Sequence, residues 1–166
     1  ARESGIGCIN MDLIAGLPGD SAAGFRASLE QVLALGPENV TVHTLALKKG
    51  SRLMEEGGGL PSGAAVADML DFAWAALRAA GQRPYYLYRQ KYMSGSFENV
   101  GWCRPGAESL YNICMMEELH TIVSLGGGGV TKLVDRATGY IERLANAKYP
   151  QEYIQKIDAI CADKAR

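Results

Sequence analysis

Apolar residues in the first part of the chain follow two different periods. The segment 8–19 has an almost continuously apolar centre and ends on Gly-Leu-Pro-Gly, which predicts a strand buried on both faces and then a turn. After Ser21, a good N-cap, apolar residues recur at i, i+4, i+7 and i+8, so we expect a helix that ends at Gly36. The β-branched segment 39–47 predicts a second strand. Strand, helix and strand with short connections predict a parallel βαβ unit with a right-handed crossover.

A second helix and a third strand extend this unit. Ser62 is a candidate N-cap, Gly81 is a candidate stop, and the apolar residues between them form a full-width helical stripe. The stripe consists of Val66, Met69, Leu70, Ala73, Trp74 and Leu77. Residues 84–89 then predict a third strand, which would complete a βαβαβ arrangement.

The second half of the chain has a different pattern. Residues 90–112 are rich in Gly, Asn, Tyr and Met with little periodicity, which predicts a long connection of functional interest. Residues 117–124 are ambiguous between the end of a helix and the start of a strand. A Gly-rich turn is expected to lead into a strand over 126–134, with 141–146 as its antiparallel partner. Pro150 then begins a last helix with one apolar face.

Composition and charge exclude several classes of protein. The 166 residues are 48% hydrophobic and 21% charged, which is an ordinary globular balance. Seventeen Lys plus Arg against 18 Asp plus Glu give a net charge of −1, which does not favour nucleic-acid binding. No apolar run approaches the roughly 20 residues that span a bilayer. The chain starts at Ala1 without an initiator Met or a signal-peptide core, so we expect a piece begun inside a longer, cytoplasmic protein.

Cysteine and histidine positions do not predict a metal site. The four cysteines lie at positions 8, 103, 114 and 161, and no pair has the two- or three-residue spacing of a metal site. We interpret them as reduced, mostly buried thiols, and we expect no metal ligand in this chain. His43 and His120 have no Cys or carboxylate at ligand spacing, so each is interpreted as a packed or exposed histidine.

Asp12 is the sharpest candidate for chemistry. It lies near the end of the first predicted strand, between Met11 and Leu13, where an ionised carboxylate needs a partner. In α/β proteins, polar residues at the carboxyl ends of parallel strands line ligand sites. A helix cap or an ion pair with a nearby cation is the structural alternative, and the spacing alone does not separate the two.

Two other segments carry weaker signals. The four glycines at 126–129 could bring backbone N–H groups to an anion, although a plain flexible turn is the alternative and neither GxGxxG nor GxxxxGK[ST] occurs. Residues 85–93 mix tyrosines with Arg89 and Lys91. This mixture suits a flat, conjugated or polyanionic ligand, and it equally suits a partly exposed strand with ordinary surface tyrosines.

Several segments in chain order give the sequence a family resemblance. The string Asp-Leu-Ile-Ala-Gly-Leu-Pro-Gly at 12–19 resembles a late barrel strand of the radical S-adenosylmethionine enzymes related to oxygen-independent coproporphyrinogen III oxidase. Other segments are similar to the subgroup called coproporphyrinogen dehydrogenase, and the resemblance covers roughly residues 8 to 160. The matching segments are 12–19, 37–46, 85–93, 98–102, 111–113 and 127–132.

The resemblance implies an α/β fold with two parts. Residues 1–89 would form the last βαβαβ part of an incomplete radical S-adenosylmethionine β/α barrel, and residues 90–166 a small α+β C-terminal domain. The family's CxxxCxxC loop, whose thiolates hold a [4Fe-4S] cluster, is absent from this sequence. Either this loop lies upstream of Ala1, which we favour, or the parent protein is a relative without a cluster. We therefore expect neither the cluster nor S-adenosylmethionine to bind stably to this chain alone.

The resemblance also implies site residues. Asp12 matches an Asp that resembles a ligand of the S-adenosylmethionine ribose hydroxyls, and Ala46 matches a small residue whose backbone lies against the same cofactor. The implied substrate, coproporphyrinogen III, carries four propionates, so local cations are needed to bind it in a chain with a net charge of −1. Arg89, Lys91 and Arg104 are the candidates for this role, with solvated surface charges as the alternative for each.

The implied activity of the intact protein is oxidative decarboxylation of coproporphyrinogen III to protoporphyrinogen IX in haem biosynthesis. Its implied partners are the porphyrinogen and an electron donor, with no nucleic acid and no membrane span. The alternative function is a haem-binding chaperone of the same superfamily, which keeps the barrel without oxidising porphyrinogens. An unrelated βαβ ligand-binding module is a third interpretation.

Overall fold

The computed structural model describes residues 1–47, 50–56, 59–89 and 97–165, and it divides into two compact units. The first unit is Ala1–Ser109 and the second is Leu110–Arg166. Each unit has its own sheet, so each is described by itself.

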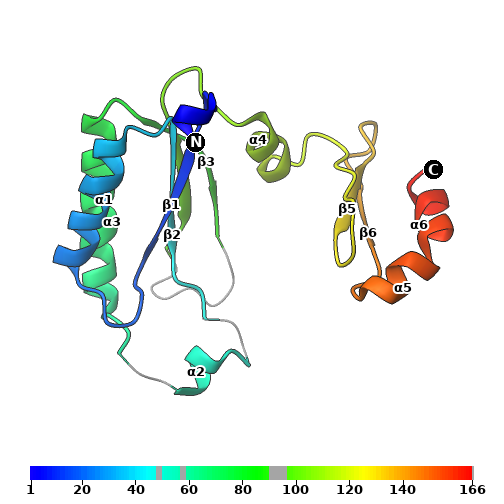
Figure 1. Cartoon of the computed structure of the whole chain (residues 1–166), viewed down its shortest axis with the longest axis horizontal. Helices are drawn as coiled ribbons and strands as arrows, with labels where there is room; N and C mark the ends of the chain where they lie inside the picture. The colour runs from blue at the N-terminus through cyan, green and yellow to red at the C-terminus, as the bar shows by residue number, and fades with distance from the viewer. Residues whose placement is uncertain (48–49, 57–58, 90–96, 166) are drawn as a thin grey trace. The chain divides into compact units, whose positions relative to one another are not determined.

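A four-stranded sheet forms the centre of the first unit (Figure 1). Its order is β1 (Asn10–Ala15), β2 (Asn39–Thr44), β4 (Asn99–Cys103) and β3 (Arg83–Tyr88). Strands β1 and β2 are parallel, with a register that runs from Asn10 opposite Asn39 to Ala15 opposite Thr44. The parallel pairing predicted from the sequence is therefore confirmed.

Strand β4 corrects the predicted βαβαβ arrangement. The sequence predicted only a long connection over 90–112, but β4 pairs antiparallel with both β2 and β3 and separates them. The sequence signal for β4 was a short alternation between residues of the core and residues of the other face. Val100 and Trp102 pack into the core, whereas Asn99 and Gly101 alternate with them and belong to the other face. Because β4 completes this sheet, the boundary between the units lies after Ser109, not after residue 89 as expected from the resemblance.

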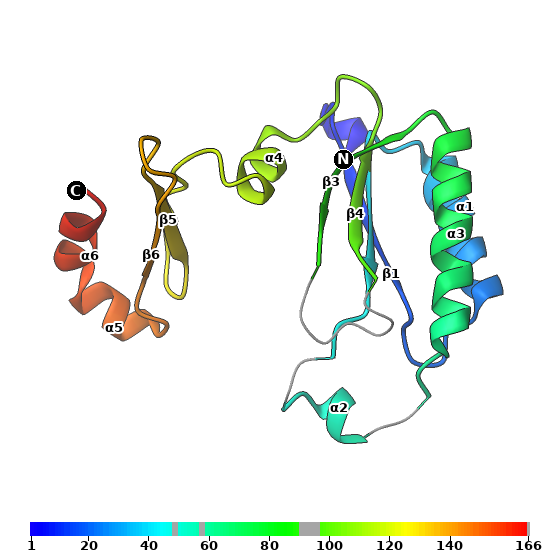
Figure 2. The same ribbon diagram turned by 180° about the vertical axis from the view of Figure 1, so that it is seen from behind.

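Two helices cover one side of this sheet, and both were predicted from their apolar spacing (Figures 1 and 2). In α1 (Ala22–Leu35), the Ser21 hydroxyl accepts a hydrogen bond from Gly24 N at 3.1 Å, and Gly36 ends the helix at φ 63°. Ser62 caps α3 (Gly63–Ala79) in the same way. Capping hydroxyls satisfy N–H groups that the first helical turn leaves free, which fixes where each helix begins.

The core of the first unit lies between these helices and the sheet. Its largest fully buried side chains come from β4, α1 and α3, and β1 and β2 contribute small or β-branched residues. The buried cluster consists of Ala15, Phe25, Leu29, Val32, Val40, Val42, Val66, Met69, Ala73, Leu77 and Trp102. Short helices η1 (Arg2–Ser4) and α2 (Arg52–Glu56) complete the unit.

The second unit is an α+β arrangement around a two-stranded sheet. Strand β5 (Val130–Val134) pairs antiparallel with β6 (Ile141–Ala145), as the sequence predicted. Helix α4 (Leu110–Met116) precedes the hairpin and was not expected. The predicted last helix is divided at Lys156 into α5 (Pro150–Gln155) and α6 (Ile157–Lys164). None of the helices in the described part of the chain is long and apolar enough to cross a membrane.

Candidate functional site

The sheet of the first unit has a polar face opposite α1 and α3. Side chains alternate between the two faces of a strand, so the residues between the core positions of β1, β2 and β3 point the other way. We call this set the polar face: Asn10, Asp12, Ile14, Thr41, His43, Tyr86 and Tyr88. On β2, Val40 and Val42 belong to the helix side, and Thr41 and His43 alternate with them.

A cleft of about 410 Å³ opens on this face at the carboxyl ends of β1, β2 and β3. It is lined by Asp12, Ile14, His43, Thr44, Leu45, Ala46, Tyr88 and Asn99. Thr44 and Tyr88 are the last residues of their strands, which explains why the cleft lies at this end. The structure thus brings Asp12 and Ala46, the two residues implied by the resemblance, to one cleft. The Asp12 side chain is 56% exposed and accessible to a ligand.

Two side chains hold the Asp12 carboxylate. Its Oδ1 accepts a hydrogen bond from Asn10 Nδ2 at 2.6 Å, and its Oδ2 lies 3.5 Å from His43 Nε2. His43 Nδ1 lies 3.2 Å from the hydroxyl of Tyr88. A neutral imidazole with its proton on Nε2 suits both neighbours, because it presents an N–H to Asp12 and accepts from Tyr88.

The electrostatics of Tyr88 support this assignment of protons. Burial raises the pKa of the Tyr88 phenol, and the neighbouring Tyr86 and Asp12 raise it further, against a hydrogen bond with Asn99 that lowers it. Desolvation disfavours the phenolate, so the hydroxyl keeps its proton at neutral pH. Tyr88 is therefore available as a hydrogen-bond donor to His43.

A second line of contacts connects the same residues. Thr41 Oγ1 donates to Asn10 Oδ1 at 3.2 Å and lies 3.2 Å from the hydroxyl of Tyr86. The rings of Tyr86 and Tyr88 are stacked, with centroids 6.4 Å apart and planes 11° from parallel. Contacts thus run from Asp12 through both tyrosines and back. We call these six residues the Asp12 network: Asn10, Asp12, Thr41, His43, Tyr86 and Tyr88.

Gly101 makes this network possible. It lies on β4 between its two sheet neighbours, Thr41 of β2 and Tyr86 of β3. A Cβ at position 101 would overlap the ring of Tyr86, so the ring crosses β4 directly above the glycine. Only a residue without a side chain lets Tyr86 reach Thr41 across the intervening strand.

Thr44 separates the cleft from the core. By the alternation of β2, its side chain shares the helix side with Val40 and Val42, and the residue is 3% exposed. Its Oγ1 is buried and has no hydrogen-bond partner among the described residues, so this hydroxyl is not offered to a ligand in the cleft. Its backbone N–H donates to Asn99 Oδ1 at 2.7 Å.

The cationic residues that the sequence singled out lie apart from one another. Arg89 directly follows Tyr88, near the cleft, and pairs with Glu98 at 3.1 Å. Lys91 lies outside the described residues. Arg104 follows Cys103, which pairs with Asn39 at the amino-terminal end of β2, so it lies at the opposite end of the sheet from the cleft.

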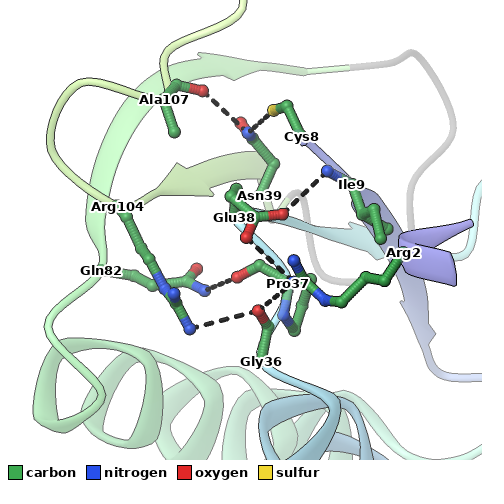
Figure 3. Close-up of polar contacts among 10 residues, drawn as sticks. All are labelled: Arg2, Cys8, Ile9, Gly36, Pro37, Glu38, Asn39, Gln82, Arg104 and Ala107. Carbon is green, nitrogen blue, oxygen red and sulfur yellow. Dashed lines mark hydrogen bonds and ion pairs between the residues drawn. The ribbon is translucent and has the colours of Figure 1, made fainter. Parts of the chain in front are cut away.

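Figure 3 shows that Arg104 belongs to a structural cluster at that end. Arg104 donates to the carbonyl of Gly36 at 3.2 Å, and Arg2 donates to the same carbonyl and pairs with Glu38 at 2.9 Å. Glu38 also accepts the N–H of Ile9 at 2.9 Å. These contacts hold the start of β1 and the loop after β4 against the end of α1. The structure does not bring Arg104 to the Asp12 cleft.

Sequence reasoning missed His43 as a site residue, because it was interpreted as a packed or exposed histidine. Tyr86 and Tyr88 were candidates to cover a flat ligand within the segment 85–93, but their connection to Asp12 was not expected. The available signal was the alternation of side chains along the strand. His43 lies two residues after Thr41 on a strand whose intervening residues are apolar, which places it on the same face as Asp12 once the parallel register is known.

The remaining candidates from the sequence, the Gly-rich turn and His120, lie in the second unit and make their contacts there. In the Gly-rich turn, the N–H of Gly126 donates to the Tyr153 hydroxyl, its carbonyl accepts from Asn146, and Gly128 N donates to a neighbouring carbonyl. These contacts favour a structural turn over an anion cradle. His120 lies 2.6 Å from Arg136. Among the residues that the structure describes, no group of three His, Cys, Asp or Glu could hold a metal ion.

No family model matches the chain, but comparisons with known proteins find relatives. It is 42% identical over 168 residues to the oxygen-independent coproporphyrinogen-III oxidase-like protein HemZ of Bacillus subtilis, covering the whole chain and 34% of that protein. It is 28% identical over 161 residues to the heme chaperone HemW of Mycobacterium tuberculosis, covering 93% of the chain and 36% of that protein. The chain thus spans about a third of the length of these relatives.

A solved structure supports the α/β fold class. Coproporphyrinogen III oxidase (HemN) from Escherichia coli, described as a radical SAM enzyme, superposes with a TM-score of 0.63 at 20% identity, over 95% of this chain and 36% of that one. The predicted resemblance to coproporphyrinogen oxidase-like proteins is confirmed, and so is the α/β fold class, with the added strand β4 as its correction.

Proposed function

We propose that this chain is part of a cytoplasmic radical S-adenosylmethionine oxidoreductase, and that its cleft binds the nucleoside of that cofactor. The observation that carries the proposal is the convergence of Asp12 and Ala46 on one cleft at the carboxyl ends of parallel strands. In this proposal residues 1–109 supply late barrel strands, and residues 110–166 form the C-terminal part.

The residues of the cleft fit a ribose with two neighbouring hydroxyls. An exposed carboxylate can accept a hydrogen bond on each oxygen, and a ribose diol donates two. The chain at Ala46 offers backbone next to a small side chain. The volume of about 410 Å³ lies in the range of small-molecule sites.

The cysteines of this chain do not fit a [4Fe-4S] site. Cys8 and Cys103 lie in the first unit and Cys114 and Cys161 in the second, and none of them belongs to a metal-binding group in the described structure. A cluster of this type needs several thiolates close together. We therefore propose that its ligands come from another part of the protein.

The proposed substrate of the whole protein is coproporphyrinogen III, which would undergo oxidative decarboxylation to protoporphyrinogen IX with an electron donor as partner. Bound S-adenosylmethionine would supply the one-electron chemistry that removes hydrogen from a propionate side chain. The residues of this chain hold the nucleoside and exclude water. Arg89, which follows β3 at the cleft end, and Lys91, which lies outside the described residues, remain candidates for binding substrate carboxylates, and Arg104 is the least favoured because of its position.

The second candidate function is a haem-binding chaperone, which the relationship to HemW favours. The greater identity to the oxidase-like HemZ makes the oxidoreductase the first choice. Both candidates can be tested on the same full-length protein. Stoichiometric haem binding without porphyrinogen turnover would support the chaperone, and decarboxylated product would support the oxidoreductase.

The nucleoside site is tested with Asp12→Asn in the full-length protein. Loss of a charged acceptor costs about 1.5–3 kcal/mol, so we expect affinity for S-adenosylmethionine to fall roughly ten- to a hundredfold by calorimetry. Asp68→Asn, on the exposed side of α3, is the matched control and should bind like the parent. Equal affinities of the parent and Asp12→Asn would reject the assignment.

A further inference from the structure

We infer that His43, Tyr88 and Tyr86 are positioning residues that orient the Asp12 carboxylate for a ligand with two neighbouring hydroxyls. They act through Asp12 and do not touch the ligand's hydroxyls themselves. This inference rests on the proposed nucleoside site and deepens it, because it names the residues that position the Asp12 carboxylate for the ribose hydroxyls.

The contacts of the Asp12 carboxylate leave each of its oxygens able to accept one more hydrogen bond. An ionised carboxylate has about four lone-pair directions, two on each oxygen. Asn10 occupies one direction on Oδ1, and the N–H of His43 faces Oδ2. One direction therefore remains on each oxygen, and two vicinal hydroxyls of a ribose would use both.

The support of Asp12 continues beyond its direct neighbours. When the hydroxyl of Tyr88 donates to His43 Nδ1, the proton of the neutral ring lies on Nε2 and is directed toward Asp12. Stacking on Tyr86 holds the Tyr88 ring, and the bond between Tyr86 and Thr41 holds Tyr86 in turn. Each side chain thus limits the rotation of the next, which reduces the conformational entropy that ligand binding must remove.

The position of these residues separates them from the core. The side chain of His43 is 25% exposed and lines the cleft, and neither His43 nor the two tyrosines belong to the buried apolar cluster. Their replacement should therefore change the orientation of Asp12 more than the stability of the fold.

The test compares two ligands in the full-length protein that contains this chain. The probes are S-adenosylmethionine and an analogue that lacks both ribose hydroxyls. The variants are His43→Phe and Tyr88→Phe, with Tyr140→Phe, exposed in the second unit, as the control. Loss of one supporting contact of the Asp12 carboxylate predicts an affinity for S-adenosylmethionine lower by about two- to tenfold in each variant. The variants and the parent should bind the analogue equally.

The signature of positioning is this dependence on the hydroxyls, because a structural role would lower the affinity for both ligands alike. His43→Gln, whose amide can still donate to Asp12, should recover part of the loss, and it replaces His43→Phe if that variant melts early. Equal losses for both ligands would overturn the inference. So would unchanged binding in both variants while Asp12→Asn binds weakly, and in that case the nucleoside site itself stands. If Asp12→Asn binds normally, both the site and the inference fall.

Discussion

The two faces of one sheet in this protein follow different rules. Toward α1 and α3, the strands present apolar side chains such as Val40, Val42 and Trp102, which the helices bury. Toward the cleft, the same strands present Asp12, His43 and other polar residues linked by hydrogen bonds. Neighbouring residues on β2 therefore serve opposite purposes, and only the alternation of the strand separates them.

The difference lies in what each face requires of its residues. Burial of apolar area is non-directional, so the helix side needs size and hydrophobicity more than particular residues. Hydrogen bonds depend on distance and angle, so the polar face needs particular residues at particular positions. Substitutions on the helix side should reduce stability, and those on the polar face should reduce ligand binding.

The largest expected effect is a loss of stability for Trp102→Ala. Trp102 is 2% exposed and is the largest fully buried side chain of the core. Its truncation removes buried apolar area and leaves a cavity, so we expect about 3–5 kcal/mol less free energy of unfolding in urea. Trp74→Ala is the control: Trp74 packs edge-on against Trp102 but is 47% exposed, so its loss should be smaller. Equal losses would contradict the description of the core.

The next effect comes from the polar face, with Gly101→Ala. The added Cβ cannot share space with the ring of Tyr86, so the ring must leave Thr41 or β4 must shift. Overpacking of this kind costs about 1–3 kcal/mol of stability, and it should also lower S-adenosylmethionine affinity in the full-length protein. Gly63→Ala, where a Cβ meets nothing within 4 Å, is the control and should keep both properties. If Gly101→Ala lowers stability and leaves affinity unchanged, the Asp12 network does not serve the cleft.

The two faces also differ in how well the sequence predicts them, because burial is non-directional and hydrogen bonds are directional. The helix side was predictable because periodicity records burial directly, as in the stripe of α3 and the strands 10–15 and 39–44. Asp12 was found because a charge within an apolar strand is conspicuous. Its partners were not, because Tyr86 and Tyr88 reach across β4, and that contact depends on strand order and on Gly101. Strand β4 itself, five residues long with a central glycine, gave too short a pattern to be recognised.

A smaller effect is expected at the helix that covers the apolar face. Ser21 caps α1 through its hydroxyl, and loss of an N-cap costs about 1 kcal/mol. Ser21→Ala should therefore lower the free energy of unfolding by about this amount, with no change in ligand affinity. Ser28→Ala on the same helix is the matched control, because the Ser28 hydroxyl bonds only back to the carbonyl of Gly24. Equal stability of Ser21→Ala and Ser28→Ala would contradict the capping role.

The smallest effect is expected for the ion pair between Arg2 and Glu38, which lies at the end of the sheet opposite the cleft and contributes to stability. The N–H of Ile9 and the guanidinium of Arg2 hold the pKa of the Glu38 carboxyl below its ordinary value of 4.5. A carboxylate with a lower pKa in the folded state stabilises the fold above pH 4.5, and this stabilisation is lost as the pH falls through the folded-state pKa. We expect Glu38→Gln to be slightly less stable than the parent at pH 7, because exposed ion pairs contribute little. The difference should narrow as the pH falls from 4.5 through the lowered pKa of Glu38, in urea unfolding at a series of pH values. Glu30→Gln, exposed on α1, is the control and should show no such convergence. A gap that stays constant over the whole acid series would mean that Glu38 acts through packing and not through its charge.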